Sequence, residues 1–171
     1  LMEHAILSPT AFNIQHWRFV QVCDSVLRAK IRDASWGQAQ VTDASLLLVV
    51  CMDLKAWGKE PQRYSRNAPP HVQDHMVTGM REYYTDNEQA QRDEGMRSAS
   101  LAAMSIMLLA TEMGYDSCPM DGFDFDAVAR LIRLPQDHAI CMMIAIGKKM
   151  QEPRPRGGQL DLDEVFFTDH F

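Results

Sequence analysis

The sequence predicts an α+β domain, or a three-layer αβα domain, for this chain of 171 residues. The length suits one compact domain with a single hydrophobic core. Predicted helices and buried strands alternate irregularly, without the regular βαβα order that is typical of doubly wound folds. Two continuous apolar runs of strand length, residues 45–52 and 138–146, indicate strands that are buried on both faces.

Helices are expected where apolar residues recur at helical spacing between capping residues. In chain order these helices cover residues 25–34, 72–84, 93–113 and 124–132. Asp24 or Ser25 is the expected N-cap of the first helix, and Gly114 is expected to follow the third. Strands are expected at residues 18–23, 45–52, 115–119 and 138–146. The polar, proline-interrupted residues 53–70 predict a loop or lid.

The two ends of the chain carry their own signals. The first residues have the pattern of an amphipathic helix that starts without a cap, so we expect residues upstream of Leu1 to be missing. Residues 148–171 are rich in proline, glycine and charge, yet they end in an apolar cluster that includes Phe166 and Phe167. Such a tail has little to bury against in one small domain, so we expect it to pack on a partner subunit.

Composition and charge argue against several classes of protein. A net charge of -6 disfavours a nucleic-acid partner, although local arginines can still hold an anionic ligand. The longest apolar stretch is shorter than the ~20 residues that a membrane span needs, and no secretory signal is recognisable. The four cysteines form no C-x-x-C pair and are expected to be buried free thiols. We therefore expect a cytoplasmic protein with no membrane partner.

The sequence lacks the common signatures of nucleophilic, dinucleotide and metal sites. It contains no G-x-S-x-G elbow, no P-loop and no G-x-G-x-x-G turn. His71 and His75 would share a helix face, as two metal ligands often do, but no third ligand is indicated. Both histidines are therefore expected to be surface or partly buried polar residues, and no metal site is predicted.

Residues 8–17 form the strongest candidate for a binding loop. Pro9 prevents the first helix from continuing, and the loop leads into the strand expected at residue 18. The side-chain amides of Asn13 and Gln15 offer donors and acceptors that suit the pyrimidine edge of a flavin. On the residues alone, an Asx-type turn with Trp17 covering the core explains the loop equally well.

This loop resembles the S-P-[ST]-[AS]-x-N-x-Q-P-W loop of the nitroreductase family, whose members are FMN-dependent enzymes that reduce substrates with NAD(P)H. The sequence departs from that pattern at His16, where the family usually has proline. In the family the asparagine reaches the pyrimidine edge of the flavin, a role that the resemblance carries to Asn13 and, more weakly, to Gln15. The positions that match are Ser8, Pro9, Thr10, Ala11, Asn13, Gln15 and Trp17.

Two further passages resemble the same family, in the family's order. Residues 113–124 are similar to the segment whose backbone lies along the flavin near N5, and residues 147–156 to the segment whose [KR]-x-R pair binds the FMN phosphate. Taken alone, the first passage is also explained by an ordinary turn and the second by a solvated basic patch. The family's N-terminal basic motif is absent, so the resemblance is to a truncated or incomplete member. The residues that these passages assign to the cofactor are Pro119, Met120, Asp121, Gly122, Arg154 and Arg156.

The resemblance covers nearly the whole chain and implies a fold and an activity. The fold is a single three-layer αβα domain over residues 1–171, with a mixed, mainly antiparallel central sheet flanked by helices. The activity is transfer of hydride from NAD(P)H through N5 of FMN to a small oxidised acceptor such as a nitroaromatic or a quinone. The enzyme is implied to be a homodimer in which the tail, residues 148–171, embraces the partner.

The resemblance requires no side chain to act as a catalytic acid or base. Tyr83 and Tyr84 are candidates for the wall of the acceptor pocket, with core or interface packing as the alternative for at least one of them. Two other functions stay open: a non-catalytic flavin-binding protein of the same fold, and an α+β interaction domain without a cofactor. The colour of the protein and its response to NAD(P)H distinguish the three.

Overall fold

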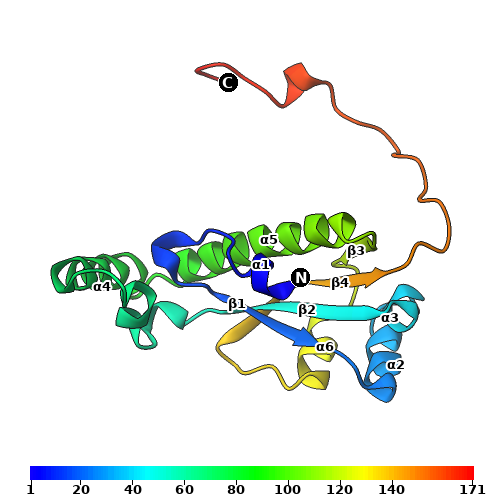
Figure 1. Ribbon diagram of the computed structural model, residues 1–171, viewed down its shortest axis with the longest axis horizontal. Helices are drawn as coiled ribbons and strands as arrows, with labels where there is room; N and C mark the ends of the chain where they lie inside the picture. Colours follow the sequence, from blue (N-terminus) through cyan, green and yellow to red (C-terminus); the bar gives the residue numbers. More distant parts are fainter.

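A four-stranded sheet forms the middle layer of the protein, which a computed structural model describes over residues 1–171 (Figure 1). The strands are paired in the order β1-β2-β4-β3, so β1 and β3 lie at the two edges. All three pairings, β1–β2, β2–β4 and β3–β4, are antiparallel. The connections between β1 and β2 and between β3 and β4 contain helices, and each returns the chain in the opposite direction. The parallel pairing of a mixed sheet, which was expected, is therefore not found. The strands are β1 (Trp17–Gln21), β2 (Leu46–Asp53), β3 (Asp116–Met120) and β4 (His138–Gly147).

Helices cover both faces of this sheet, which confirms the expected three layers (Figure 1). One face is covered by α1 (Met2–Ala5) and α5 (Glu88–Glu112), and α4 (Pro70–Tyr84) packs against α5. The other face is covered by α2 (Ser25–Asp33), α3 (Gln40–Asp43) and α6 (Phe125–Leu131).

The apolar run of β2 is explained by its central place in the sheet. Alternate side chains of a strand point to opposite faces. Leu47, Val49 and Cys51 belong to the core beneath α2 and α6. Their neighbours Leu48, Val50 and Met52 belong to the core beneath α5. Both faces of β2 are therefore buried, as the absence of alternation in the sequence indicates.

Capping side chains place the helix ends close to where the sequence predicts them. The Asp24 carboxylate accepts a hydrogen bond from the Leu27 N–H at 2.8 Å and begins α2. Gly114 has a φ of +76° after the end of α5, a conformation that favours glycine. The start of α5 differs from the expectation, because the helix begins at Glu88 behind the N-cap Asn87 rather than near residue 93. Its first turns are polar, and this hides the helical spacing of apolar residues.

The segment expected as a loop or lid, residues 53–70, is pinned to the body by a small core of its own. Two short 3-10 helices, Ala56–Gly58 and Pro61–Ser65, form within it. The buried Tyr64 ring packs in a cluster with Ile14 of the loop before β1 and with residues of α4, and its hydroxyl donates to the Ala56 carbonyl at 2.8 Å. This packing brings the segment next to the loop of residues 8–16.

All four cysteines are free thiols, but only two of them are buried as expected. Burial raises the pKa of the Cys51 thiol to about 12 and also raises that of Cys141. The expectation is wrong for Cys23 and Cys118, which are exposed. Cys23 lies just beyond the end of β1, and Cys118 lies on the edge strand β3, so neither is covered on every side.

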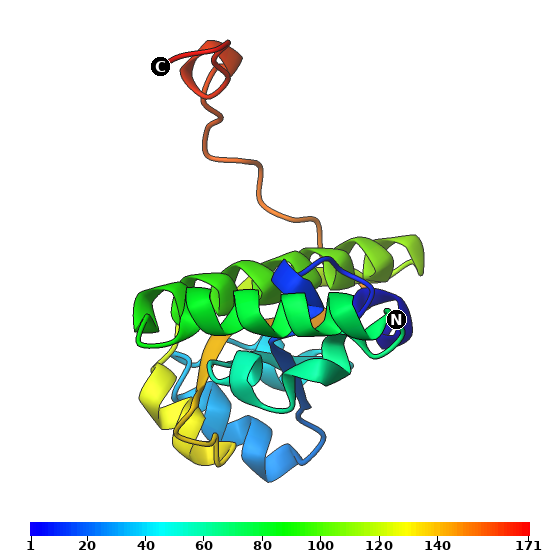
Figure 2. The ribbon, with the colours of Figure 1, turned by 90° about the vertical axis from the view of Figure 1, so that its left-hand side faces the viewer.

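Residues 148–171 leave the end of β4 and extend away from the three layers (Figures 1 and 2). Apart from the short 3-10 helix Leu162–Glu164 they form no helix or strand, and nearly all of them are exposed. The Phe167 and Phe171 rings contact each other, with centroids 4.8 Å apart, rather than the body. No helix of the protein has both the length and the apolar character needed to cross a membrane.

Candidate functional site

The loop before β1 has an unusual backbone. Phe12, Asn13 and Gln15 all have positive φ angles, of 52°, 58° and 54°. Each such non-glycine residue costs about 1 kcal/mol or more, so the surrounding contacts must hold the loop in place. The Thr10 hydroxyl accepts from the Gln15 N–H at 3.0 Å, and the Ser8 hydroxyl lies 2.8 Å from the Ser105 hydroxyl of α5. Strain of this kind is characteristic of binding loops.

The side-chain amides of Asn13 and Gln15 form hydrogen bonds that hold the loop, and both residues also line a pocket. Asn13 donates through Nδ2 to the Tyr64 carbonyl at 2.9 Å, and Gln15 donates through Nε2 to the Asn13 carbonyl at 3.1 Å. These bonds leave both side-chain carbonyl oxygens without a donor. Asn13 and Gln15 also line a pocket of about 940 Å³. The loop is therefore a turn held by its own side chains beside a pocket, and its role in binding a ligand stays a prediction.

The second group of candidate residues lies at the opposite edge of the sheet, on β3 and just after it. The Met120 side chain is buried in the core, while Pro119 and Asp121 are exposed. Gln38 donates through Nε2 to the Gly122 carbonyl at 2.8 Å and holds this turn. A Cβ added to Gly122 would lie 2.7 Å from the indole ring of Trp36, so the backbone here passes against a flat aromatic ring.

A pocket of about 630 Å³ opens on the same side of the sheet, beside β3 and the start of the tail. The pocket is lined by Gln40, by the cations Arg154, Lys148 and Lys149, and by the acidic residues Asp43, Asp116 and Glu152. Arg156, the other member of the expected pair, lies outside this pocket on the exposed tail. Lys149 is paired with Glu152 at 2.6 Å, whereas Lys148 and Arg154 form no ion pair and are the cations available to a phosphate group.

Sequence reasoning missed three residues at this edge: Trp36, Gln38 and Gln40. Trp36 and Gln38 lie between α2 and α3, and Gln40 is the first residue of α3; no motif marks these positions. In the structure, Trp36 and Gly37 form a turn with φ angles of 55° and 74°. These backbone angles cannot be read from a sequence. A glycine after a tryptophan in a short polar stretch is a weak hint of such a turn.

A single chain does not bring the two groups of candidate residues together. The loop of residues 8–16 precedes β1, whereas residues 119–122 and Arg154 lie beside β3. Strands in a sheet are about 4.8 Å apart, so the edges of a four-stranded sheet are separated by roughly 14 Å. The strands β2 and β4 fill that space.

A model of the nitroreductase family matches residues 1–148. The chain belongs to the nitroreductase family. Protein DrgA of Synechocystis is 51% identical over 152 residues, which cover 89% of this chain and 72% of that protein. MhqN of Bacillus subtilis, which is provisionally named as an NAD(P)H nitroreductase, is 38% identical, and the match covers 96% of this chain and 83% of that protein.

Solved structures agree with this family and confirm the α+β fold. A provisionally assigned nitroreductase of Bacillus subtilis, ydfN, has a TM-score of 0.90 at 37% identity, covering 97% of this chain and 84% of that chain. A provisionally assigned nitroreductase of Exiguobacterium sibiricum, solved in complex with FMN, has a TM-score of 0.87 at 26% identity, covering 98% of this chain and 83% of that chain. As a member of the nitroreductase family the protein is an oxidoreductase.

His16, which stands where this family usually has proline, is completely buried. Its side chain is 0% exposed, and neither ring nitrogen has a hydrogen-bond partner. Burial outweighs the nearby carboxylates of Glu94 and Asp53 and lowers the pKa of His16 to about 4. The imidazole is therefore neutral at pH 7 and belongs to the core rather than to either pocket.

The two tyrosines of α4 are divided between the core and the surface. Tyr84 is fully buried, and its ring packs against Trp57 and His16. Its hydroxyl has no hydrogen-bond partner, and burial raises the pKa of that hydroxyl. Tyr83 is 55% exposed. The core alternative is therefore confirmed for Tyr84, and only Tyr83 stays available to a ligand.

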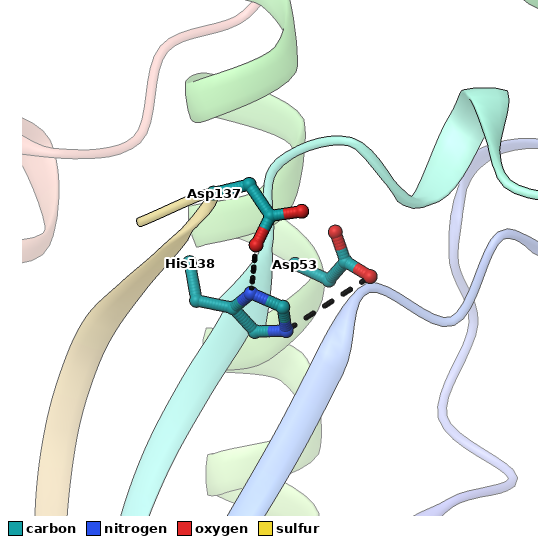
Figure 3. Close-up of side chains that lie close together, drawn as sticks. All are labelled: Asp53, Asp137 and His138. Carbon is teal, nitrogen blue, oxygen red and sulfur yellow. Dashed lines mark hydrogen bonds and ion pairs between the residues drawn. The ribbon is translucent and has the colours of Figure 1, made fainter. Parts of the chain in front are cut away.

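The only group of side chains spaced as metal ligands would be consists of Asp53, Asp137 and His138 (Figure 3). Lys59 already lies between the two carboxylates, with Nζ 2.9 Å from both Asp53 oxygens and 2.6 Å from Asp137. Arg18 adds a second cation, 3.2 Å from Asp53. Hydrogen bonds from Lys59 and His138 lower the pKa of Asp137 to about 2. We therefore assign an ion-pair network to these residues rather than a metal site.

The histidines considered as metal ligands from their spacing, His71 and His75, lie on α4 outside this network. Both are exposed, which agrees with the expectation of surface residues.

Replacing Asp53 with alanine is expected to destabilise the protein. The carboxylate is 2% exposed and accepts hydrogen bonds from Arg18, Lys59 and the Lys55 N–H, so its loss leaves two cations close together. Because both cations are partly exposed and regain water, we expect the free energy of unfolding to fall by about 2 kcal/mol. Urea unfolding at pH 7 measures this. Asp33→Ala, at an exposed position of α2, is the control, and equal midpoints for the two variants would contradict the network.

Proposed function

We propose that this protein is an FMN-dependent oxidoreductase that transfers hydride from NAD(P)H to a small oxidised acceptor such as a nitroaromatic or a quinone. The observation that carries the proposal is the pocket beside β3, in which two cations, Lys148 and Arg154, form no ion pair with the protein. Two relatives support it: MhqN is provisionally named as an NAD(P)H nitroreductase, and the Exiguobacterium structure contains FMN. The free cysteines favour the cytoplasm, where thiols stay reduced.

The residues around that pocket fit FMN. A volume of about 630 Å³ lies within the range of roughly 300–1,000 Å³ that is usual for cofactor sites. Arg154 and Lys148 supply positive charge for the phosphate, and Arg156 follows on the tail. Gln38 fixes the Gly122 carbonyl, and the Trp36 ring packs against this glycine on the side where a Cβ would lie. When bound, FMN supplies the redox chemistry, because its ring accepts hydride and gives it up again.

The protein's own contribution is binding and orientation. Pro119, Asp121 and Gly122 are proposed as the wall beside the ring, with Met120 anchoring that wall in the core. At the other edge, Ser8, Pro9, Thr10, Asn13 and Gln15 are proposed as a second wall. Asn13 and Gln15 line the pocket, and no protein group donates to their side-chain carbonyl oxygens. No side chain is proposed as a catalytic acid or base.

The two walls require a second subunit, and we propose a homodimer. The loop of residues 8–16 in one protomer would complete the site beside β3 of its partner, since one chain holds these parts at opposite edges. Helix α5 offers an apolar stripe for such contact at Leu101, Met104 and Leu108, which are 43%, 49% and 59% exposed. The apolar end of residues 148–171 is free to cover the partner.

Mixing the purified protein with FMN and then with NADPH or NADH tests the activity. We expect a yellow protein whose visible flavin band bleaches without oxygen and returns when a quinone or a nitroaromatic is added. A band that persists after NADPH and NADH are added would instead indicate a non-catalytic flavin-binding protein. A colourless protein after incubation with FMN would indicate an interaction domain without a cofactor.

A further inference from the structure

The pocket beside β1 concentrates positive charge in a protein that is acidic overall. Its charged lining residues are Arg18, Arg63 and Arg66, and no aspartate or glutamate lines it. The whole chain has a net charge of -6, so this excess of arginine is local. Only Arg18 has a carboxylate partner, Asp53, which does not line the pocket, so an anionic ligand would balance the charge of the other two guanidinium groups.

Two of the three arginines are available to a ligand. Arg18 is occupied, since it donates to Asp53 at 3.2 Å and to the Gln15 and Trp17 carbonyls at 2.9 and 2.7 Å. Arg63 donates only to the Tyr64 hydroxyl, at 3.0 Å, and its guanidinium lies 4.9 Å from the centre of that ring. Arg66 has neither a hydrogen bond nor an ion pair within the protein. Arg18 therefore supplies a fixed charge, while Arg63 and Arg66 have donors to spare.

A buried hydroxyl in the same pocket also lacks a partner. Ser65 is 8% exposed and lines the pocket, and its Oγ has no hydrogen-bond partner. Buried polar groups are almost always paired in folded proteins, so an orphan at a pocket wall indicates a missing ligand. A hydroxyl donor beside two free guanidinium groups matches the oxygens of a phosphate.

We propose that this pocket binds a phosphate group of the reduced pyridine dinucleotide, held by Arg63, Arg66 and Ser65. This inference rests on the proposed function, which makes NADPH or NADH the hydride donor. Asn13 and Gln15 connect this pocket with the proposed flavin site, because they line the pocket and are also proposed to contact the flavin. A dinucleotide whose nicotinamide lies on the flavin would thus have its phosphates beside these arginines.

Nucleotide binding to the FMN-loaded protein, measured by calorimetry without any acceptor, tests the pocket. The probes are 2′,5′-ADP, 5′-ADP and adenosine. We expect both phosphorylated probes to bind at least tenfold more tightly than adenosine, and Arg63→Gln/Arg66→Gln to abolish that difference. Tighter binding of 2′,5′-ADP than of 5′-ADP would assign the pocket to the 2′-phosphate, and equal binding to the pyrophosphate. Equal affinities of all three probes, or an unchanged double variant, would overturn the proposal.

Matched variants separate binding from folding. Arg92→Gln removes an exposed arginine of α5 and is expected to leave nucleotide affinity unchanged. Ser65→Ala is expected to weaken 5′-ADP binding by roughly fivefold, a hydrogen-bond effect, without lowering the unfolding temperature of the free protein. In steady-state assays Arg63→Gln/Arg66→Gln should raise KM for the dinucleotide at least tenfold with kcat and FMN content retained. Phosphate-dependent binding to a protein that is never bleached would refute the proposed activity and leave the pocket standing.

Discussion

Removal of residues 157–171 is expected to yield a monomer that has lost its flavin. The segment carries the apolar side chains of the tail, and Phe166 and Phe171 are 69% and 106% exposed in the single chain. We propose that these side chains pack on the partner subunit, whose loop of residues 8–16 completes each flavin site. Loss of the partner therefore removes one wall of the site together with the dimer contacts. Light scattering and the flavin-to-protein absorbance ratio measure both effects.

The truncated chain keeps Arg154 and Arg156, so a loss of flavin could not be attributed to missing phosphate contacts. A full-length variant, Phe166→Ser/Phe167→Ser, tests whether the aromatic side chains rather than the length of the tail are responsible. It is expected to shift the protein toward the monomer in the same direction. A monomer that retains all of its flavin would show that one chain builds the site alone.

Acidification from pH 7 to pH 4 is expected to remove about 3 kcal/mol of stability through His16 alone. The folded-state pKa of His16 is about 4, against 6.5 for an unperturbed histidine. The unfolded chain therefore takes up a proton first as the pH falls, and this favours unfolding. The contribution of His16 is complete above pH 6.5 and is lost progressively down to pH 4. Urea unfolding at several pH values within this window measures it.

A phenylalanine at the same position removes the titrating group from the core. His16→Phe is expected to flatten the dependence of stability on pH between 6.5 and 4, while the His16 carbonyl that accepts from the Asp53 N–H is kept. His71→Gln, at an exposed position of α4, is the matched control and should keep the wild-type slope. Asp137 contributes little in this window, because its pKa is about 2 in the folded protein and 3.8 for an ordinary aspartate, so most of its effect falls below pH 4. Parallel slopes for the wild type and His16→Phe would contradict the assignment.

The local elements were largely predictable because their signals are local. Asp24 and Gly114 mark helix ends through their own capping geometry, and the apolar residues 45–52 can only be a strand with both faces covered. The start of α5 was missed because Gln91 and Glu94 are polar and yet buried. Gln91 donates to the Tyr84 carbonyl at 2.6 Å, a contact with the preceding helix that the sequence pattern does not express.

For the candidate site, the sequence likewise indicated the residues but not their positions in space. The resemblance to one family was enough to select three candidate segments from the sequence, residues 8–17, 119–122 and 154–156. The amides, the glycine and the arginines in these segments indicated which part of a flavin each could contact. Their places in space could not be selected in that way. The order β1-β2-β4-β3 depends on pairings between strands that are far apart in the chain, and it separates the loop before β1 from the turn after β3. In the proposed homodimer, the expected site would therefore consist of two parts that come from different subunits.

The loop of residues 8–17 illustrates where each kind of information ends. Sequence alone predicted a binding loop that begins near Pro9, carries two amides and departs from its family at His16. Only the tertiary structure decided that the imidazole is buried without a partner and that Arg63, Arg66 and Ser65 converge on the same pocket. The burial of His16 and the gathering of Arg63, Arg66 and Ser65 at one pocket depend on the packing of residues 53–70 against this loop. Such packing joins residues that are far apart in the chain, so no periodic pattern of apolar residues predicts it.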